Sequence, residues 1–131
     1  MADRPEALFW ERVGESTAIR CSLCGQRCKI EDGARGICQV RENQGGTLRP
    51  LAYGKLLALN PDPIEKKPLS HFQPGTRSLS IASAGCNLRC PWCQNHHMSE
   101  MVRREGGRIR GELVPPEVVV VESLILVQVI E

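Results

Sequence analysis

Three cysteines in one short loop have the residue type and the spacing to hold a metal centre. Cys86, Cys90 and Cys93 form a C-x3-C-x2-C arrangement directly after a short apolar run, within the stretch SLSIASAGCNLRCPWCQN. A closed structural zinc site needs four protein ligands, and an ordinary four-iron cluster needs four cysteines. Three thiolates leave one metal position open to another ligand, and an open position indicates chemistry.

A histidine is the alternative ligand for that fourth position. His96 or His97 would complete a Cys3His zinc site. Both lie so close to Cys93 that ligation would strain the loop, whereas zinc ligand pairs normally come from two separated segments. The spacing therefore favours a cluster with an open position over a closed zinc site.

The other four cysteines form a second group near the N-terminus. They are spaced C-x2-C-x3-C-x9-C, at Cys21, Cys24, Cys28 and Cys38. Four thiolates within 18 residues can close a tetrahedron around a metal, and the glycines between them allow the tight turns of such a knuckle. Zinc is the first choice for this knuckle and an auxiliary iron–sulfur cluster is the alternative, which spacing does not separate.

Composition bounds the kind of protein that these sites can belong to. The chain has 131 residues, of which 41% are hydrophobic and 4% aromatic, which is enough for one modest core. A net charge of +2 does not suggest nucleic acid as a partner. Four arginines do cluster, but glycines interrupt them, and we interpret them as a solvated connection. They are Arg103, Arg104, Arg108 and Arg110.

Neither a signal peptide nor a membrane span is expected. The first 15 residues carry charges where an apolar signal region would lie. The apolar stretch Val118 to Ile130 is interrupted by Glu122 and Gln128 and is too short to cross a bilayer. Two tight cysteine clusters fit metal ligation in a reducing compartment better than a disulfide framework, which predicts a cytoplasmic protein.

Local patterns predict the elements that must position the cysteines. Pro5 to Val13 is expected to be a short helix, and the strands Thr47 to Tyr53 and Lys55 to Leu59 to form a hairpin around Gly54. The segment Ile64 to Gly75, with Lys66, Lys67 and His71, is interpreted as a surface loop. Ser78 to Ala82 is the expected strand before the three cysteines. A helix is expected within Glu112 to Glu131, starting at Pro115-Pro116-Glu117.

These elements suggest three regions. Residues 1–45 would form an N-terminal segment with the four-cysteine knuckle, and residues 46–75 the hairpin and a linker. Residues 76–131 would carry the three-cysteine loop on the strand that precedes it. In barrels and open parallel sheets, functional loops lie at the carboxyl ends of strands, which is where this loop stands.

Three motifs in order resemble a known family. The knuckle reads C-x-L-C-x3-C followed by G-x-R-G-x-C-x-V-R, and Asp62 to Phe72 reads DPIEKKPLSHF. Ala84 to Asn95 reads AGCNLRCPWCQN, with the aromatic Trp92 before the last cysteine. Together they resemble the radical S-adenosylmethionine (SAM) enzyme of the AmmeMemoRadiSam system, which is related to pyruvate formate-lyase activating enzymes.

The resemblance implies a fold and a reaction. The fold would be α/β, the start of a partial (β/α) radical SAM barrel preceded by the cysteine-rich module and a hairpin. Cys86, Cys90 and Cys93 would hold a 4Fe-4S cluster whose remaining iron binds SAM, with Trp92 packing near the adenine. Reductive cleavage of SAM would give a 5'-deoxyadenosyl radical. Implied partners are a reductase or flavodoxin-like electron donor and other proteins of the system.

The C-terminal part departs from the family pattern. The 57 residues from Gly75 to Glu131 hold at most one βαβ unit of about 30 residues, whereas a closed barrel needs about 200 or more. We therefore expect a C-terminally truncated member, and leave open whether this chain is itself an active enzyme. The alternative function is a zinc-binding interaction module without catalysis, in which all cysteines are structural.

Overall fold

The computed structural model describes residues 5–128 and divides the chain into two units. The first unit is made of two separate stretches of the chain, the N-terminal stretch up to Tyr53 and Ala84–Arg110. The second unit is made of Gly54–Ser83 and the segment from Gly111 onward. The last residues of the expected C-terminal helix, 129–131, lie outside the described residues. Both cysteine groups belong to the first unit.

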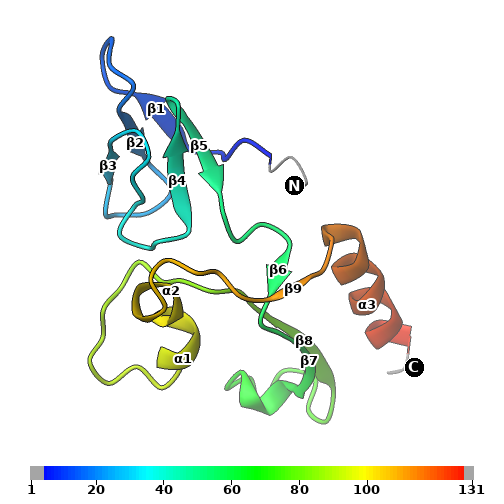
Figure 1. Cartoon of the computed structure of the whole chain (residues 1–131). Coiled ribbons are helices and arrows are strands. Elements are labelled where there is room, and N and C mark those ends of the chain that lie inside the picture. The colour runs from blue at the N-terminus through cyan, green and yellow to red at the C-terminus, as the bar shows by residue number, and fades with distance from the viewer. Residues whose placement is uncertain (1–4, 129–131) are drawn as a thin grey trace. The chain divides into compact units, whose positions relative to one another are not determined.

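The first unit is built mainly from short antiparallel strands (Figure 1). One sheet has the order β1-β2-β3 and the other is the hairpin β4-β5. These strands are β1 (Trp10–Arg12), β2 (Ile19–Cys21), β3 (Lys29–Ile30), β4 (Arg41–Gln44) and β5 (Thr47–Pro50). Two single-turn helices, α1 (His96–Ser99) and α2 (Met101–Arg104), follow the three-cysteine loop.

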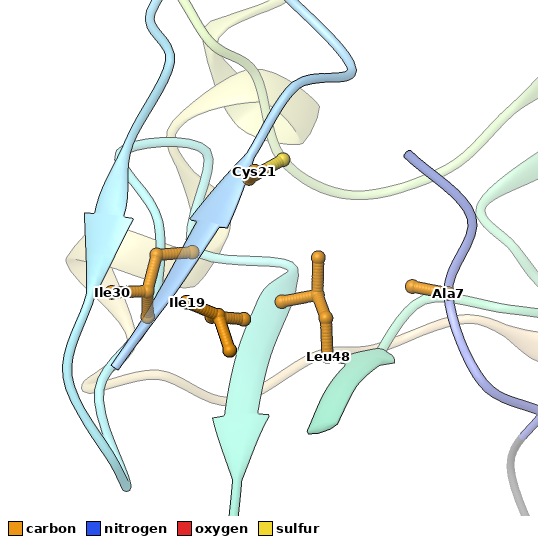
Figure 2. Close-up of a cluster of buried hydrophobic side chains, with 5 residues drawn as sticks. All are labelled: Ala7, Ile19, Cys21, Ile30 and Leu48. Atoms are coloured by element: carbon orange, nitrogen blue, oxygen red, sulfur yellow. The ribbon is translucent and has the colours of Figure 1, made fainter. Parts of the chain in front are cut away.

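A small hydrophobic core holds these strands together. Figure 2 shows Ile19, Ile30 and Leu48 gathered between β2, β3 and β5, with Ala7 beyond Leu48 and Cys21 at the end of β2. Ile19 and Leu48 are 0% exposed and Ile30 is 2% exposed, so each contributes about 1.5 to 3 kcal/mol through burial. The first unit thus has a core of its own, although a small one.

Asn43 lies inside this unit and joins its two sheets. Its side-chain amide is 0% exposed and donates to the backbone oxygens of Thr17 at 2.8 Å and Ile30 at 2.9 Å. Its side-chain oxygen accepts the Gly46 amide at 2.9 Å. Both positions of the Gly45-Gly46 turn have positive φ, 62° and 80°, which glycine adopts without strain. Every polar atom of the buried amide group therefore has a partner.

The second unit pairs strands that are far apart in the sequence. β6 (Lys55–Leu56) pairs with β9 (Glu112–Leu113), and β7 (Ala58–Pro63) pairs with β8 (Arg77–Ala82). The 3-10 helix η1 (Ile64–Lys66) follows β7, and α3 runs over Pro116–Gln128. Throughout residues 5–128, all the strand pairings are antiparallel. No helix in this range is both long enough and apolar enough to cross a membrane.

Two of the expected elements are confirmed. The strand predicted at Ser78 to Ala82 is β8, and the helix predicted to start at Pro115-Pro116-Glu117 is α3. Pro116 occupies the first turn of α3, where a missing amide hydrogen costs nothing.

Two other expectations are wrong. The segment predicted as a helix at Pro5 to Val13 contains β1, and Phe9 has a φ of 59°, which a right-handed helix excludes. Pairing with β2 therefore overrides the local helical pattern. The strands predicted around Gly54 do not pair with one another, because Thr47 onward pairs with β4 while Lys55–Leu56 pairs with β9.

Asp62 on β7 is the best-connected carboxylate of the second unit. It accepts hydrogen bonds from the Ser80 hydroxyl at 2.5 Å and from the ammonium groups of Lys67 and Lys66, both at 2.9 Å. These three donors, the Ser80 hydroxyl first, hold the pKa of Asp62 well below its usual range. The two lysines thus belong to a local ion-pair network of the predicted surface loop.

The depressed pKa of Asp62 predicts acid sensitivity of the β7–β8 hairpin. The unfolded carboxyl has a pKa of about 3.9, and the folded one lies lower, so its stabilisation is complete above pH about 4 and is lost as the pH falls through the folded pKa. We expect Asp62→Asn to be less stable than wild type at neutral pH and to lose this pH dependence. The pH dependence of the hairpin's stability is measured by NMR as amide exchange in β7 and β8. The measurement covers pH 2 to 6, roughly two pH units either side of the unfolded pKa. Glu112→Gln in β9 is the control and should keep the wild-type profile; an Asp62→Asn profile that parallels wild type would contradict the assignment.

Candidate functional site

The loop Cys86–Cys93, called the cluster loop below, is shaped by consecutive backbone turns. The Cys93 amide donates to the Cys90 carbonyl at 3.2 Å, and the His96 amide donates to the Cys93 carbonyl at 3.2 Å. The chain then enters α1 directly. All three cysteines of the loop are half-buried. Each thiol of the loop therefore keeps partial access to solvent.

Hydrogen-bond donors lie beside two of the three sulfurs. The Leu88 amide points at Cys86 Sγ at 3.4 Å, and the Ser99 hydroxyl lies 3.3 Å from Cys93 Sγ. Amide and hydroxyl contacts of this kind stabilise sulfur in its anionic, metal-ligating form. The loop therefore supplies polar support for thiolates in addition to the thiols themselves.

Trp92 and the two histidines surround the loop without converging on it. Trp92 is 83% exposed, so its indole can cover a ligand bound beside the loop. The rings of His96 and His97 are edge-to-face with centroids 6.0 Å apart, and His96 Nδ1 lies 3.3 Å from the Cys93 carbonyl oxygen. His96 thus contacts the backbone of the loop.

The segment Cys21–Cys38, called the knuckle, brings its cysteines to the edge of the small core. The Cys21 amide donates to the Cys28 carbonyl at 2.9 Å, across β2 and β3. A Cβ built on Gly36 would lie 3.7 Å from Cys28 Sγ and 3.8 Å from Cys38 Sγ, so both sulfurs lie over this glycine. A larger side chain at Gly36 would occupy the space in which these sulfurs approach one another.

The buried guanidinium of Arg41 faces the sulfur of Cys21, the first cysteine of this group. Its Nη1 donates to Cys21 Sγ at 3.1 Å, and its Nη2 donates to the Leu8 carbonyl. A buried charge requires partners, and an anionic thiolate at Cys21 would be the matching one. This contact fits a metal-bound thiolate at Cys21, since a metal keeps the sulfur deprotonated.

The residues therefore fit metal centres in donor type, spacing and polar support. Among residues 5–128, however, no three cysteine, histidine or carboxylate side chains gather closely enough to enclose an ion, and none of the seven thiols is in a disulfide. Rotation about a single side-chain bond moves a thiol between staggered positions. A metal in either group would therefore require the sulfurs to move closer together than they lie in this structure.

Three residues that join the knuckle to the cluster loop were not identified from the sequence. Gln26 Nε2 donates to the Asn87 carbonyl at 3.1 Å, and Arg103 donates to carbonyls of both segments. Gly85 lies so close to the knuckle that a Cβ there would be 2.8 Å from the Cys38 carbonyl oxygen. The interpretation of Arg103 as part of a solvated connection is wrong. Of the three, only Gly85 carried a signal in the sequence, because it directly precedes the first cysteine of the cluster loop.

Comparison with curated proteins finds similarity to an uncharacterized protein of Methanocaldococcus jannaschii. The two are 47% identical over 95 residues, which make up 72% of this chain and 28% of the relative. The chain thus matches less than a third of the length of that relative. No family model and no solved structure matches the chain.

Proposed function

We propose that this chain carries the cluster-binding part of a radical SAM protein. Cys86, Cys90 and Cys93 would hold a 4Fe-4S cluster, as the resemblance of their motif implies. The observation that supports this best is the cluster loop itself, in which half-buried thiols on tight turns have an amide at Cys86 and a hydroxyl at Cys93. Three thiolates leave one iron open for the amino and carboxylate groups of SAM.

When bound, such a cluster supplies one electron to the SAM sulfonium, which breaks its C5'–S bond and releases methionine and a 5'-deoxyadenosyl radical. The residues of this chain would bind and shield. The three cysteines would hold the cluster, and the exposed indole of Trp92 would pack against the adenine and exclude water on one side.

The knuckle would be a structural centre beside the reactive one. Zinc is our first proposal for Cys21, Cys24, Cys28 and Cys38, and an auxiliary iron–sulfur cluster is the alternative. Support comes from the sulfurs of Cys28 and Cys38 over Gly36 and from the Arg41 guanidinium at Cys21. A metal there would stabilise a unit whose apolar core is small.

The proposal also includes the surroundings of the site. β8 would be the first strand of a (β/α) barrel, of which this chain holds only the beginning, and the protein would work in the cytoplasm with a reductase or flavodoxin-like electron donor. Other proteins of the AmmeMemoRadiSam system would be its partners.

A zinc-binding interaction module is the second candidate. It is favoured by exposed apolar side chains on α3, which a partner could cover. They are Val118, Val120, Val121 and Leu124. In that case both cysteine groups would bind zinc and no SAM chemistry would occur.

Anaerobic reconstitution with iron and sulfide, followed by low-temperature EPR of the dithionite-reduced chain, tests the first candidate against the second. We expect a cluster signal that changes on adding SAM, because SAM would enter the coordination of the open iron. A colourless, zinc-loaded protein without such a signal would reject the radical SAM proposal and favour the interaction module.

A further inference from the structure

Arg103 is placed where one side chain reaches both cysteine segments. Its Nη1 donates to the carbonyl of Ile37 at 3.1 Å and to that of Cys86 at 3.2 Å, and its Nη2 donates to the carbonyl of Leu88 at 2.9 Å. Ile37 directly precedes Cys38 in the knuckle, and the other two carbonyls belong to the cluster loop. The rigid fork of a guanidinium can satisfy these three acceptors at once.

The charge of Arg103 has no carboxylate partner among the described residues. By contrast, Arg35 pairs with Glu42, Arg104 with Glu100 and Arg110 with Glu105. A half-buried cation that contacts only carbonyls retains its attraction for a nearby anion. In the proposed function, the anion that the site would supply is a cluster held in part by Cys86, whose own carbonyl Arg103 contacts.

Other contacts dock the same half of the loop on the knuckle. Gln26 holds the Asn87 carbonyl at 3.1 Å, and Gly85 packs against Val40 and the Cys38 carbonyl. The Gly85 amide in turn donates to the Met98 carbonyl at 3.1 Å. The first cysteine of the loop is therefore fixed relative to the last cysteine of the knuckle, and Arg103 contacts both sides of this junction.

We infer that Arg103 is a positioning residue of the cluster site, which clamps the cluster loop onto the knuckle and provides a positive charge beside the cluster. The role of the charge rests on the proposed function, because that function identifies the anion as a cluster. The role as a clamp rests on the contacts alone. Added positive charge favours the reduced, more negative state of a cluster, so Arg103 raises its reduction potential.

Three variants of the full chain separate the clamp from the charge. Arg103→Met removes both, and Arg103→Lys keeps the charge but cannot span three carbonyls in the geometry of the fork. Arg104→Met is the matched control, because Arg104 lies on the same helix and pairs only locally with Glu100. Hydrogen exchange of the peptide 84–95 reports the clamp, and EPR redox titration of the reconstituted protein reports the charge.

For Arg103→Met we expect exchange in residues 84–95 about tenfold faster than wild type and a potential lower by up to about 59 mV, the one-electron equivalent of a tenfold change. Arg103→Lys should show the faster exchange with a near-wild-type potential, and Arg104→Met should change neither. If Arg103→Met exchanged residues 84–95 at the wild-type rate, Arg103 would not clamp the loop. If Arg103→Met and wild type had equal reduction potentials, the charge of Arg103 would not act on the cluster. A wild-type chain without a cluster would defeat the proposed function, while the exchange experiment would still decide the clamp.

Discussion

Replacing Cys90 with alanine is expected to abolish the SAM-dependent EPR signal of the reconstituted protein. In the proposed function Cys90 is the middle ligand of the cluster, and its carbonyl accepts a hydrogen bond from the Cys93 amide at 3.2 Å. Two remaining thiolates cannot hold three irons, and loss of a direct ligand costs more than the roughly 10- to 100-fold that an outer-shell change costs. We expect less than about a tenth of the wild-type signal.

The matched control for this substitution is Leu88→Ala in the same loop. The Leu88 side chain is 54% exposed, and its contacts with Cys86 Sγ and Arg103 are made by backbone atoms that alanine retains. The control should therefore keep the full SAM-dependent signal. If Cys90→Ala kept it as well, the three-cysteine ligation on which the proposed function rests would be wrong.

Substituting Gly85 with alanine should strongly destabilise the first unit. An added Cβ would lie 2.5 Å from Val40 Cγ1 and 2.8 Å from the Cys38 carbonyl oxygen, and the φ of Gly85 is 95°. The unfavourable backbone region costs about 1 to 2 kcal/mol and overpacking about 1 to 3 kcal/mol more, which predicts a loss of about 3 kcal/mol. Both tryptophans, Trp10 and Trp92, lie in this unit, so denaturation followed by tryptophan fluorescence measures its stability.

Two other glycines separate the steric cost from the backbone cost. Gly33 also has a positive φ, 74°, but no atom lies within 4 Å of the position of a Cβ, so Gly33→Ala should cost only about 1 to 2 kcal/mol. Gly25 has neither a positive φ nor a close neighbour, and Gly25→Ala should leave stability within about 1 kcal/mol of wild type. Equal losses in all three variants would contradict the close packing of Gly85 against the knuckle.

Local sequence signals predicted the elements whose structure is determined locally. β8 follows an apolar strand pattern that ends just before the cysteines, and α3 begins at a proline pair that favours a first helical turn. In both elements the determining interaction lies within a few residues. The two cysteine groups were singled out by the spacing of their cysteines, and their role as metal ligands stays a prediction.

Elements that depend on distant partners were missed. β1 forms because β2 pairs with it, and Lys55–Leu56 pairs with Glu112–Leu113 rather than with its sequence neighbours. Arg103 looked like one of several solvated arginines because its acceptor in the knuckle, the Ile37 carbonyl, is 66 positions away. The pattern within a single segment does not specify which other segment it contacts, and the contact of Arg103 depends on how the chain returns to the first unit at Ala84.

Because two separate stretches of the chain form the first unit, its parts are synthesised one after the other. Its closing contacts join residues 61, 66 and 72 positions apart, from Gln26, Ile37 and Arg35 to Asn87, Arg103 and Gly107. The knuckle makes its own contacts locally and leaves the ribosome first, whereas all of Gly54–Ser83 must be made before the cluster loop exists. The four-cysteine segment can therefore fold first and act as the template on which the cluster loop docks. Under the proposed function, a cluster at Cys86, Cys90 and Cys93 would be inserted only after this docking.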